Sequence, residues 1–255
     1  MAGKAVKSVF DKYAHEYDLI TNAEQREAYH AEEVAALIDR FAPTSVLDAG
    51  CATGLTAALF ARNGVRAVGL DRSREMLRVA RQNYTDTPLP LSFRFGHFEK
   101  LPANLAGRFD LVVCLANSIS GVASKKDLRL CFNGFRRVLR PGGSLVLQML
   151  NYSSIKENEP MPIKVTENGG IIYIRYSIRR ASRLTVHVVR LDMRAKDAPR
   201  FEPFVHEFGN FTPEIVRGLI GALGFNDLRE FSDLYLSRRF GPRSRDFVIT
   251  AKRPK

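Results

Sequence analysis

Short apolar runs alternate with helix-like segments over roughly the first 150 residues of the chain. One run ends at Asp48 and a second at Asp71, and three more occupy 91–96, 109–117 and 144–150. The stretches between them carry apolar residues three or four positions apart, the spacing of one helical face. Strands that alternate with helices predict a doubly wound α/β fold, with a mostly parallel sheet covered on both faces.

Cap and stop residues indicate where the helices begin and end. Asn22 can cap a helix that Pro43 stops, and Ser73 can cap the helix after the second strand. A further helix is predicted over 127–139, where the sequence RPGG ends it. Thr212 is suited to cap the last helix, ahead of a closing strand.

The N-terminal segment, 8–20, has a helical pattern of its own. Phe10, Tyr13 and Tyr17 are spaced for one face of a helix. This stripe predicts either a lid over a ligand site or an ordinary amphipathic face packed on the core.

The pattern changes after residue 150. Segments 171–178 and 183–193 are rich in β-branched residues and separated by a few polar ones, which predicts an antiparallel pair inserted into the α/β fold. The chain therefore divides into N-terminal lid helices with the first part of the core (1–151), a β-rich insertion (152–210), and the last helix and strands of the core (211–255).

The net charge of +12 is concentrated in two late segments. Residues 171–200 hold eight Arg or Lys against two Asp, and residues 236–255 hold seven against one. A basic face can attract RNA, an anionic lipid surface or an anionic substrate. It can equally be a solvated surface with no partner.

Other classes of protein are disfavoured by composition. The three cysteines, Cys51, Cys114 and Cys131, lack CxxC spacing and lie in apolar or helical contexts, so buried thiols are expected and neither a metal site nor a disulfide framework is. No apolar run is long enough to span a bilayer, and the start has no secretory h-region. A cytoplasmic protein with no membrane segment is expected.

The stretch VLDAGCATG carries the main chemical signal. Gly50 and Gly54 let the turn and the following helix approach a ligand closely. Asp48, directly before the turn, would repel a pyrophosphate but attract an ammonium group. Asp71, about 20 residues further on, suits the paired hydroxyls of a ribose. A ligand with an ammonium, a ribose and no phosphate is S-adenosylmethionine.

This segment resembles motif I of class I S-adenosylmethionine-dependent methyltransferases. The resemblance continues through FGHFEKLP, FDLVVCLANSISGV, FRRVLRPGGSLVLQMLNY and TPEIVRGLIGALGF, and covers residues 8–155 and 211–252. CLANS, LRPGG and LQMLNY look closest to the glycine and sarcosine N-methyltransferase-like branch of small-molecule enzymes. The family implies a seven-stranded Rossmann-like sheet, with the antiparallel insertion after the fifth strand.

The resemblance implies a set of cofactor contacts. It puts the methionine end of the cofactor at the glycine-rich turn, its carboxylate on Arg26 of an N-terminal helix, its ribose on Asp71 and its adenine against Arg72 and Met76. The residues expected to bind the cofactor are Tyr17, Arg26, Asp48, Gly50, Cys51, Ala52, Thr53, Gly54, Asp71, Arg72, Met76, His97, Phe98, Leu115 and Asn117.

Two positions depart from the family pattern. Ala52 replaces the middle glycine of the turn, a change the turn tolerates if the φ of Ala52 is negative. His97 stands where many relatives have an acid that accepts the adenine amino group. A neutral imidazole can accept through one nitrogen, or Glu99 can take this role.

The acceptor side of the site is less defined. Methyl transfer is an in-line displacement that needs a general base only when the acceptor arrives protonated, so no catalytic residue is assigned. Asn117 and Ser118 follow the fourth strand, where they can face the methyl group or cap a helix. The substrate candidates are Tyr13, Ser118, Asn151, Tyr152, Arg175 and His187, and with His206 the last two are available to meet a carboxylate.

Three functions remain open. The favoured one is transfer of a methyl group from S-adenosylmethionine to the N or O of a small molecule, with S-adenosylhomocysteine as product. RNA or protein methylation through the two basic segments is the first alternative, although Ala116–Ile119 lack the [DN]PP[FYW] tetrapeptide of nucleobase amine methylation. An inactive cofactor-binding regulator is the second. The assembly state is also open, a homodimer included.

Overall fold

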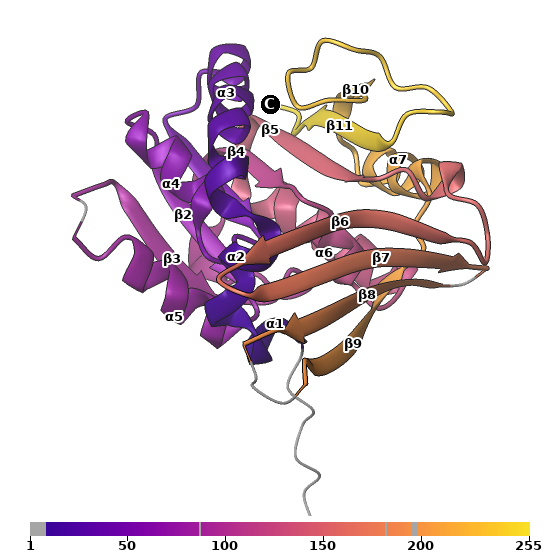
Figure 1. The fold of residues 1–255 in the computed structure, drawn as a ribbon. Coiled ribbons are helices and arrows are strands. Elements are labelled where there is room, and N and C mark those ends of the chain that lie inside the picture. The colour runs from indigo at the N-terminus through magenta and orange to yellow at the C-terminus, as the bar shows by residue number, and fades with distance from the viewer. Residues whose placement is uncertain (1–8, 87, 182, 195–197) are drawn as a thin grey trace, which may run out of the picture.

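A seven-stranded sheet forms the centre of the molecule (Figure 1). The structure is a computed structural model that describes residues 9–255 except 87, 182 and 195–197. Within this described part, the strand order is β10-β11-β5-β4-β1-β2-β3, with β11 antiparallel to β5, β10 antiparallel to β11 and the other neighbours parallel. The predicted doubly wound, mostly parallel sheet is confirmed. Its strands are β1 (Ser45–Ala49), β2 (Arg66–Asp71), β3 (Leu91–Phe95), β4 (Phe109–Cys114), β5 (Leu139–Leu150), β10 (Asn226–Phe231) and β11 (Asp246–Lys252).

Helices cover both faces of this sheet. Side chains alternate along each strand, so Val46 of β1 joins the cluster with Val34 of α3, whereas Leu47 joins the cluster with Phe132 of α6. Burial on both faces explains why the strands read as continuous apolar runs. The helices are α3 (Ala23–Phe41), α4 (Leu55–Arg62), α5 (Arg74–Asn83), α6 (Lys125–Val138) and α7 (Pro213–Ala222), with short 3-10 turns η2 (Ala103–Leu105), η3 (Ser118–Gly121) and η4 (Tyr152–Ser154).

The predicted caps are present. The side chains of Asn22, Ser73 and Thr212 accept hydrogen bonds from backbone amides in the first turns of α3, α5 and α7. Each bond satisfies an amide that has no partner inside its helix.

The N-terminal segment is broken where one helical face was predicted. It forms α1 (Val9–Lys12), the 3-10 turn η1 (Ala14–Glu16) and α2 (Tyr17–Thr21). Tyr13 has a non-helical backbone, with φ −114° and ψ 25°, and its hydroxyl bonds to Glu202 of a distant strand. Tertiary contacts therefore outweigh local helical spacing here. Ser8 and the side chain of Phe10 lie outside the described residues.

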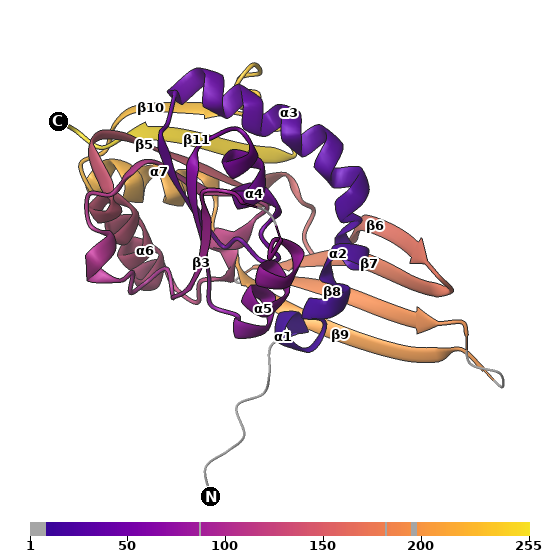
Figure 2. The ribbon, with the colours of Figure 1, turned by 90° about the vertical axis from the view of Figure 1, so that its left-hand side faces the viewer.

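The insertion is a four-stranded antiparallel sheet rather than a pair (Figure 2). The predicted strands form its middle, β7 (Ile171–Arg180) and β8 (Arg183–Asp192), flanked by β6 (Pro160–Asn168) and β9 (Arg200–Gly209). Both flanking strands contain proline, which lacks the amide that a central strand must donate. Proline is tolerated at an edge, and this is why the sequence pattern missed these two strands.

One face of the second sheet packs on the N-terminal segment. Tyr173 of β7, Val188 of β8 and Phe204 of β9 cluster with Tyr13 and Ile20. In Figure 2 the four strands lie beside α1 and α2, at the end of the molecule away from α6 and α7. We call the face that carries Tyr173, Val188 and Phe204 the inner face.

Candidate active site

A cavity lies at the carboxyl ends of β1, β2 and β4, the edge where ligands bind in open α/β sheets. The loops after these strands, the start of α5 and the inner face of β9 line it. Nine of the residues predicted from sequence line this cavity, which is called the donor cavity after the ligand expected there: Tyr17, Gly50, Ala52, Asp71, Arg72, Met76, Phe98, Asn117 and Ser118.

The glycine-rich turn is held in a left-handed backbone conformation. Gly50 has φ +88°, and a Cβ there would lie 2.6 Å from the Cβ of Ser118. The condition under which the turn would tolerate Ala52 without strain, a negative φ, is not met, because its φ is +48°. This conformation costs an alanine about 1 kcal/mol or more. It directs the Ala52 amide at the Oδ2 of Asp71, 2.9 Å away, so the strain accompanies a defined contact.

Asp71 ends β2 with its carboxylate at the cavity. Its two oxygens accept the amides of Ala52 and Ser73, at 2.9 and 2.8 Å. Burial raises the pKa of Asp71, and these amide bonds oppose the rise. Each carboxylate oxygen keeps a further lone pair for a ligand hydroxyl.

Asp48 and Arg26 carry buried polar atoms without partners. The Oδ2 of Asp48 and the Nε of Arg26 make no hydrogen bond to any described residue. Burial, followed by the charge of Asp71, raises the pKa of Asp48 to about 7, while a backbone hydrogen bond from Ala57 and the charge of Arg26 oppose the rise. Neither residue is among those that line the donor cavity. A carboxyl oxygen and a guanidinium nitrogen that are both buried without partners are nevertheless suited to a ligand that brings its own ammonium and carboxylate.

Other predicted cofactor residues support the turn instead of lining the cavity. The Thr53 hydroxyl donates to Asp18 at 2.6 Å. Cys51 is 6% exposed and its sulfur faces Gly69, while Gly54 leaves room for the Phe93 ring, which a Cβ would approach to 2.6 Å. Leu115 is buried in the core, and its neighbour Ala116 lines the cavity.

His97 does not line the donor cavity. It makes an edge contact with Phe95 and a bridge with Lys100, whereas Phe98 and Glu99 line the cavity. Glu99, the alternative weighed for adenine recognition, is therefore the better-placed acceptor.

A second cavity adjoins the first, between the N-terminal segment and the second sheet. Tyr17, Ala116, His206 and Phe208 line both cavities. The remaining residues of this acceptor cavity are Tyr13, Ile20, Thr21, Arg175, Val186, Val188 and Phe204. Sequence reasoning missed Phe204 and Phe208, although the alternation in FVHEF at 204–208 would have put them on one face with His206.

Three substrate candidates lie away from the acceptor cavity. His187 is on the opposite face of β8 from Val186 and Val188, and it stacks on Tyr176 with ring centroids 4.7 Å apart. Asn151 is 1% exposed and donates to the carbonyls of Pro242 and Ser244. These contacts give Asn151 a loop-fixing role and leave His187 outside the cavity.

Tyr152 acts through Asn117 rather than by direct contact. The ring is fully buried, and its hydroxyl hydrogen-bonds the Asn117 side chain. The Oδ1 of Asn117 also accepts the Leu150 amide at 3.1 Å, while Asn117 itself has φ +66°. Tyr152 and the end of β5 thus fix the residue that lines the donor cavity.

His206 occupies the junction of the two cavities. Burial, together with the charge of Arg72, lowers its pKa to about 4. The imidazole is therefore neutral at physiological pH and can accept a hydrogen bond through one ring nitrogen.

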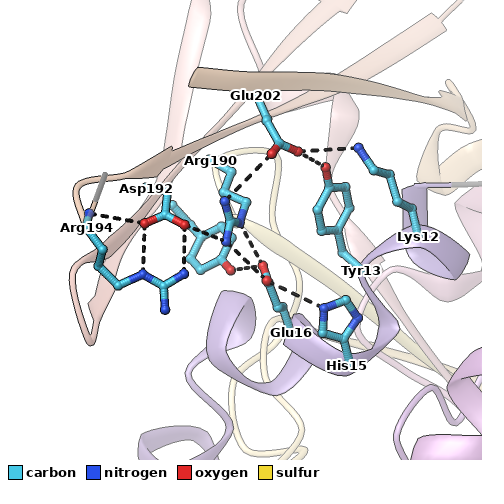
Figure 3. A network of polar contacts seen from close by, with 9 residues as sticks. Lys12, Tyr13, His15, Glu16, Arg190, Asp192, Arg194 and Glu202 are labelled. Carbon is cyan, nitrogen blue, oxygen red and sulfur yellow. Dashed lines mark hydrogen bonds and ion pairs between the residues drawn. The ribbon is translucent and has the colours of Figure 1, made fainter. Parts of the chain in front are cut away.

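A polar network fastens the N-terminal segment over the acceptor cavity (Figure 3). Glu16 of η1 accepts from Arg190 of β8 and from the Tyr173 hydroxyl. Glu202 of β9 accepts from Tyr13 and from Lys12. Both acids thus join the N-terminal segment to the second sheet.

Membrane-spanning helices and metal-binding clusters are both absent from the described part of the chain. Its helices include none long and apolar enough to cross a membrane. Residues 9–255, outside the gaps given above, contain no group of three His, Cys, Asp or Glu side chains that could hold a metal ion.

Comparison with known proteins agrees with this geometry. Residues 46–143 match a family model described as a methyltransferase domain. A ubiquinone biosynthesis O-methyltransferase from Xanthomonas oryzae pv. oryzae is 33% identical over 118 residues, which is 46% of this chain and 47% of that protein. The matched region thus spans about half the length of that relative.

Solved structures resemble nearly the whole chain. An S-adenosylmethionine-dependent methyltransferase from Clostridium acetobutylicum has a TM-score of 0.77 at 17% identity, over 97% of this chain and 100% of that one. CalS10 from Micromonospora echinaspora, an amino pentose methyltransferase solved with S-adenosylmethionine, has a TM-score of 0.73 at 19% identity, over 99% and 100%. Residues 46–143 of this chain thus match a methyltransferase domain, and the chain shares its fold with solved S-adenosylmethionine-dependent methyltransferases.

Proposed function

We propose that the chain transfers a methyl group from S-adenosylmethionine to a nitrogen or oxygen of a small molecule. The observations that carry this proposal are the buried, unpartnered atoms of Asp48 and Arg26 and the Asp71 carboxylate that lines the donor cavity. Asp48 and Arg26 complement an amino-acid zwitterion, and Asp71 presents carboxylate oxygens to a ribose. No other class of ligand considered above needs all three.

The chain's residues fit this donor along its whole length. Arg26 would hold the carboxylate, Asp48 the ammonium and Asp71 the ribose hydroxyls. Met76 and Phe98 offer apolar surface to the adenine, and Glu99 lies where an amino group can be accepted. Bound there, the donor supplies an activated methyl group on a sulfonium.

The residues at the junction of the cavities align the reaction. The acceptor lone pair forms the new bond to the methyl carbon while the carbon–sulfur bond breaks, and its electron pair leaves with sulfur as the thioether of S-adenosylhomocysteine. Tyr17, Asn117 and His206 surround the junction and exclude water. His206, neutral by its lowered pKa, accepts a hydrogen bond from the acceptor N–H or O–H, and the proton released passes to solvent.

The acceptor cavity is covered, and this supports a small acceptor. The second sheet and the N-terminal segment cover this space and are joined by the Glu16–Arg190 pair. This chain resembles CalS10 over nearly all its length, and the acceptor named for CalS10, an amino pentose, is also a small molecule.

The charge of the insertion gives little support to the RNA alternative. Arg183 pairs with Glu207, Arg190 with Glu16, and Arg194 with Asp192. Arginines that already face carboxylates release few counterions on meeting a phosphate backbone. The homodimer and the N-methyltransferase branch remain predictions.

The test is donor binding followed by transfer. Calorimetry should detect binding of S-adenosylmethionine, and Asp71→Ala should weaken it at least about tenfold, or about 1.4 kcal/mol, because a charged acceptor of hydroxyl bonds is lost. Incubation with donor labelled in the methyl group and pools of small amines and phenols should label a product. Binding without transfer to any small-molecule, RNA or protein pool would indicate a regulator.

A further inference from the structure

We propose that the acceptor is an aromatic or similarly flat apolar molecule bearing one carboxylate, which Arg175 binds while the nucleophilic atom lies at His206. This inference rests on the proposed methyl transfer and adds the class of acceptor. It comes from the walls of the acceptor cavity, which combine apolar and aromatic side chains with one unpaired guanidinium.

Arg175 differs from the other described arginines of the second sheet in having a buried side-chain nitrogen without a hydrogen-bond partner. Its Nε is buried and makes no hydrogen bond to any described residue. The side chain lies on the inner face of β7, across from Val188 of β8, which in turn lies across from Phe204 of β9. Other arginines of the sheet have carboxylate partners: Arg179 with Glu157, Arg183 with Glu207, Arg190 with Glu16 and Arg194 with Asp192.

A buried guanidinium nitrogen without a hydrogen-bond partner is costly unless a ligand supplies the acceptor. Burial lowers the pKa of Arg175; Tyr17 opposes this effect and the charge of Arg26 adds to it. Arg26 and Arg175 each have a buried Nε without a partner, and two such groups are best satisfied by two separate anions. The proposed function gives Arg26 to the carboxylate of the donor, so Arg175, which lines the acceptor cavity, is left for the acceptor.

A carboxylate fits this single arginine better than a phosphate does. One planar guanidinium can pair with one carboxylate through two parallel hydrogen bonds. A phosphate monoester carries nearly two charges and usually draws several cations. Arg175 is the only charged side chain among the residues that line the acceptor cavity in the described part of the chain.

The other walls of the acceptor cavity are apolar and aromatic, and they indicate the chemistry of the part of the acceptor that carries the carboxylate. The rings of Tyr13 and Phe204 stack with centroids 4.4 Å apart, and Tyr17, Ile20 and Phe208 add apolar surface. Such walls favour a flat apolar group, which offset stacking and burial both stabilise.

The positions of Arg175 and His206 set the length of the acceptor. His206 lies across from Val186, which lies across from Ser177, so it is two strands and two residues away from Arg175. Strand spacing and rise put their Cα atoms roughly 12 Å apart. Both residues line the acceptor cavity, and this separation of their Cα atoms leaves room for about one ring between the acceptor's carboxylate and its reacting atom.

Binding of matched acids and amides to the wild-type protein with S-adenosylhomocysteine tests the proposal. The probes are 4-hydroxybenzoate, 4-aminobenzoate and 3-phenylpropionate, each beside its primary amide, measured by calorimetry or ligand-observed NMR. At least one acid should bind ten times more tightly than its amide. Equal affinity within every pair, or no binding of any acid, would overturn the proposal.

Variants separate this result from failure of the donor site. Arg175→Met should remove the preference for acids while affinity for S-adenosylmethionine stays within twofold. Arg180→Met removes an exposed arginine on the opposite face of the same strand and should leave both affinities unchanged. If Arg175→Met instead weakens the donor and spares the acids, Arg175 belongs to the donor site. A wild-type protein that binds no S-adenosylmethionine would refute the methyl transfer itself.

Discussion

Glu16 and Arg190 lie 174 positions apart in the sequence, yet the Nε of Arg190 is 3.0 Å from the Oε2 of Glu16. Their side chains are 14% and 9% exposed, so the pair is nearly buried. It joins the N-terminal segment to the second sheet (Figure 3), close in sequence to Tyr13 and Tyr17, which line the acceptor cavity. The shape of that cavity therefore depends on an interaction between the two ends of the fold.

Arg190→Met should destabilise the protein and impair acceptor binding. Removing Arg190 leaves the nearly buried Glu16 carboxylate without its arginine and with the Tyr173 hydroxyl as a donor, which costs about 3 kcal/mol in the free energy of unfolding. Urea denaturation measures this loss, and the KM for the acceptor should rise more than that for the donor. Arg183→Met, in an exposed pair with Glu207, is the matched control and should cost less than about 1 kcal/mol. Similar losses in the two variants would mean that the Arg190 pair is not buried in solution.

The same pair should respond to acid. Burial alone raises the pKa of Glu16, but hydrogen bonds from Tyr173 and Arg190 outweigh this and lower the pKa below its usual value. A lowered carboxyl pKa adds stability that is present above about pH 4.3 and is lost as the pH falls through the lower, folded-state pKa. Thermal unfolding of wild type and Glu16→Gln should therefore converge only below about pH 4. A gap between them that stays constant down to pH 3 would contradict this.

Donor affinity should depend on the ionisation of Asp48. Its pKa is raised to about 7, so below that pH the carboxyl is protonated and cannot pair with an ammonium. Affinity for S-adenosylmethionine should rise about tenfold between pH 6 and pH 8, as calorimetry can measure. Asp48→Asn should abolish the rise. Without donor, the raised acid pKa has the opposite sign for folding, and the protein should lose stability as the pH rises from about 4 to 7.

Arg26 should contribute to donor binding through its charge. Arg26→Met keeps much of the side-chain length and removes the guanidinium, so affinity for S-adenosylmethionine should fall about tenfold or more. Affinity for the decarboxylated donor should barely change, because that ligand has no carboxylate with which Arg26 could pair. Equal losses for the two ligands would make Arg26 structural.

The left-handed backbone of Ala52 should determine how substitutions at this position change the free energy of unfolding. Ala52→Gly relieves strain but loses a methyl group packed near Met76 and gives the unfolded chain more freedom, so the free energy of unfolding should change by less than about 1 kcal/mol. Ala52→Val should lower it by about 2 kcal/mol, since a β-branched residue is strained at this φ. Urea denaturation distinguishes the two. A valine variant as stable as wild type would mean that the turn adopts a different backbone in solution.

Local pattern was sufficient for the core of the fold and for the donor turn. The strands that end at Asp48 and Asp71, the caps at Asn22 and Ser73, and the close turn at Gly50 all depend on neighbours within a few residues. Strand periodicity, capping and glycine conformation act at that range. For this reason the donor cavity could be placed from the sequence.

Only tertiary structure decided which side chains of the predicted site face a ligand. Cys51 and Leu115 are adjacent to cavity residues, but each points into the core, because alternate positions of a strand and turn face opposite sides. His187 and His206 were equal candidates in the sequence. The register of β8 and β9 brings His206 to the junction of the cavities and turns His187 away. That register is set by pairing between strands and by packing on the N-terminal segment, neither of which can be read from a single segment.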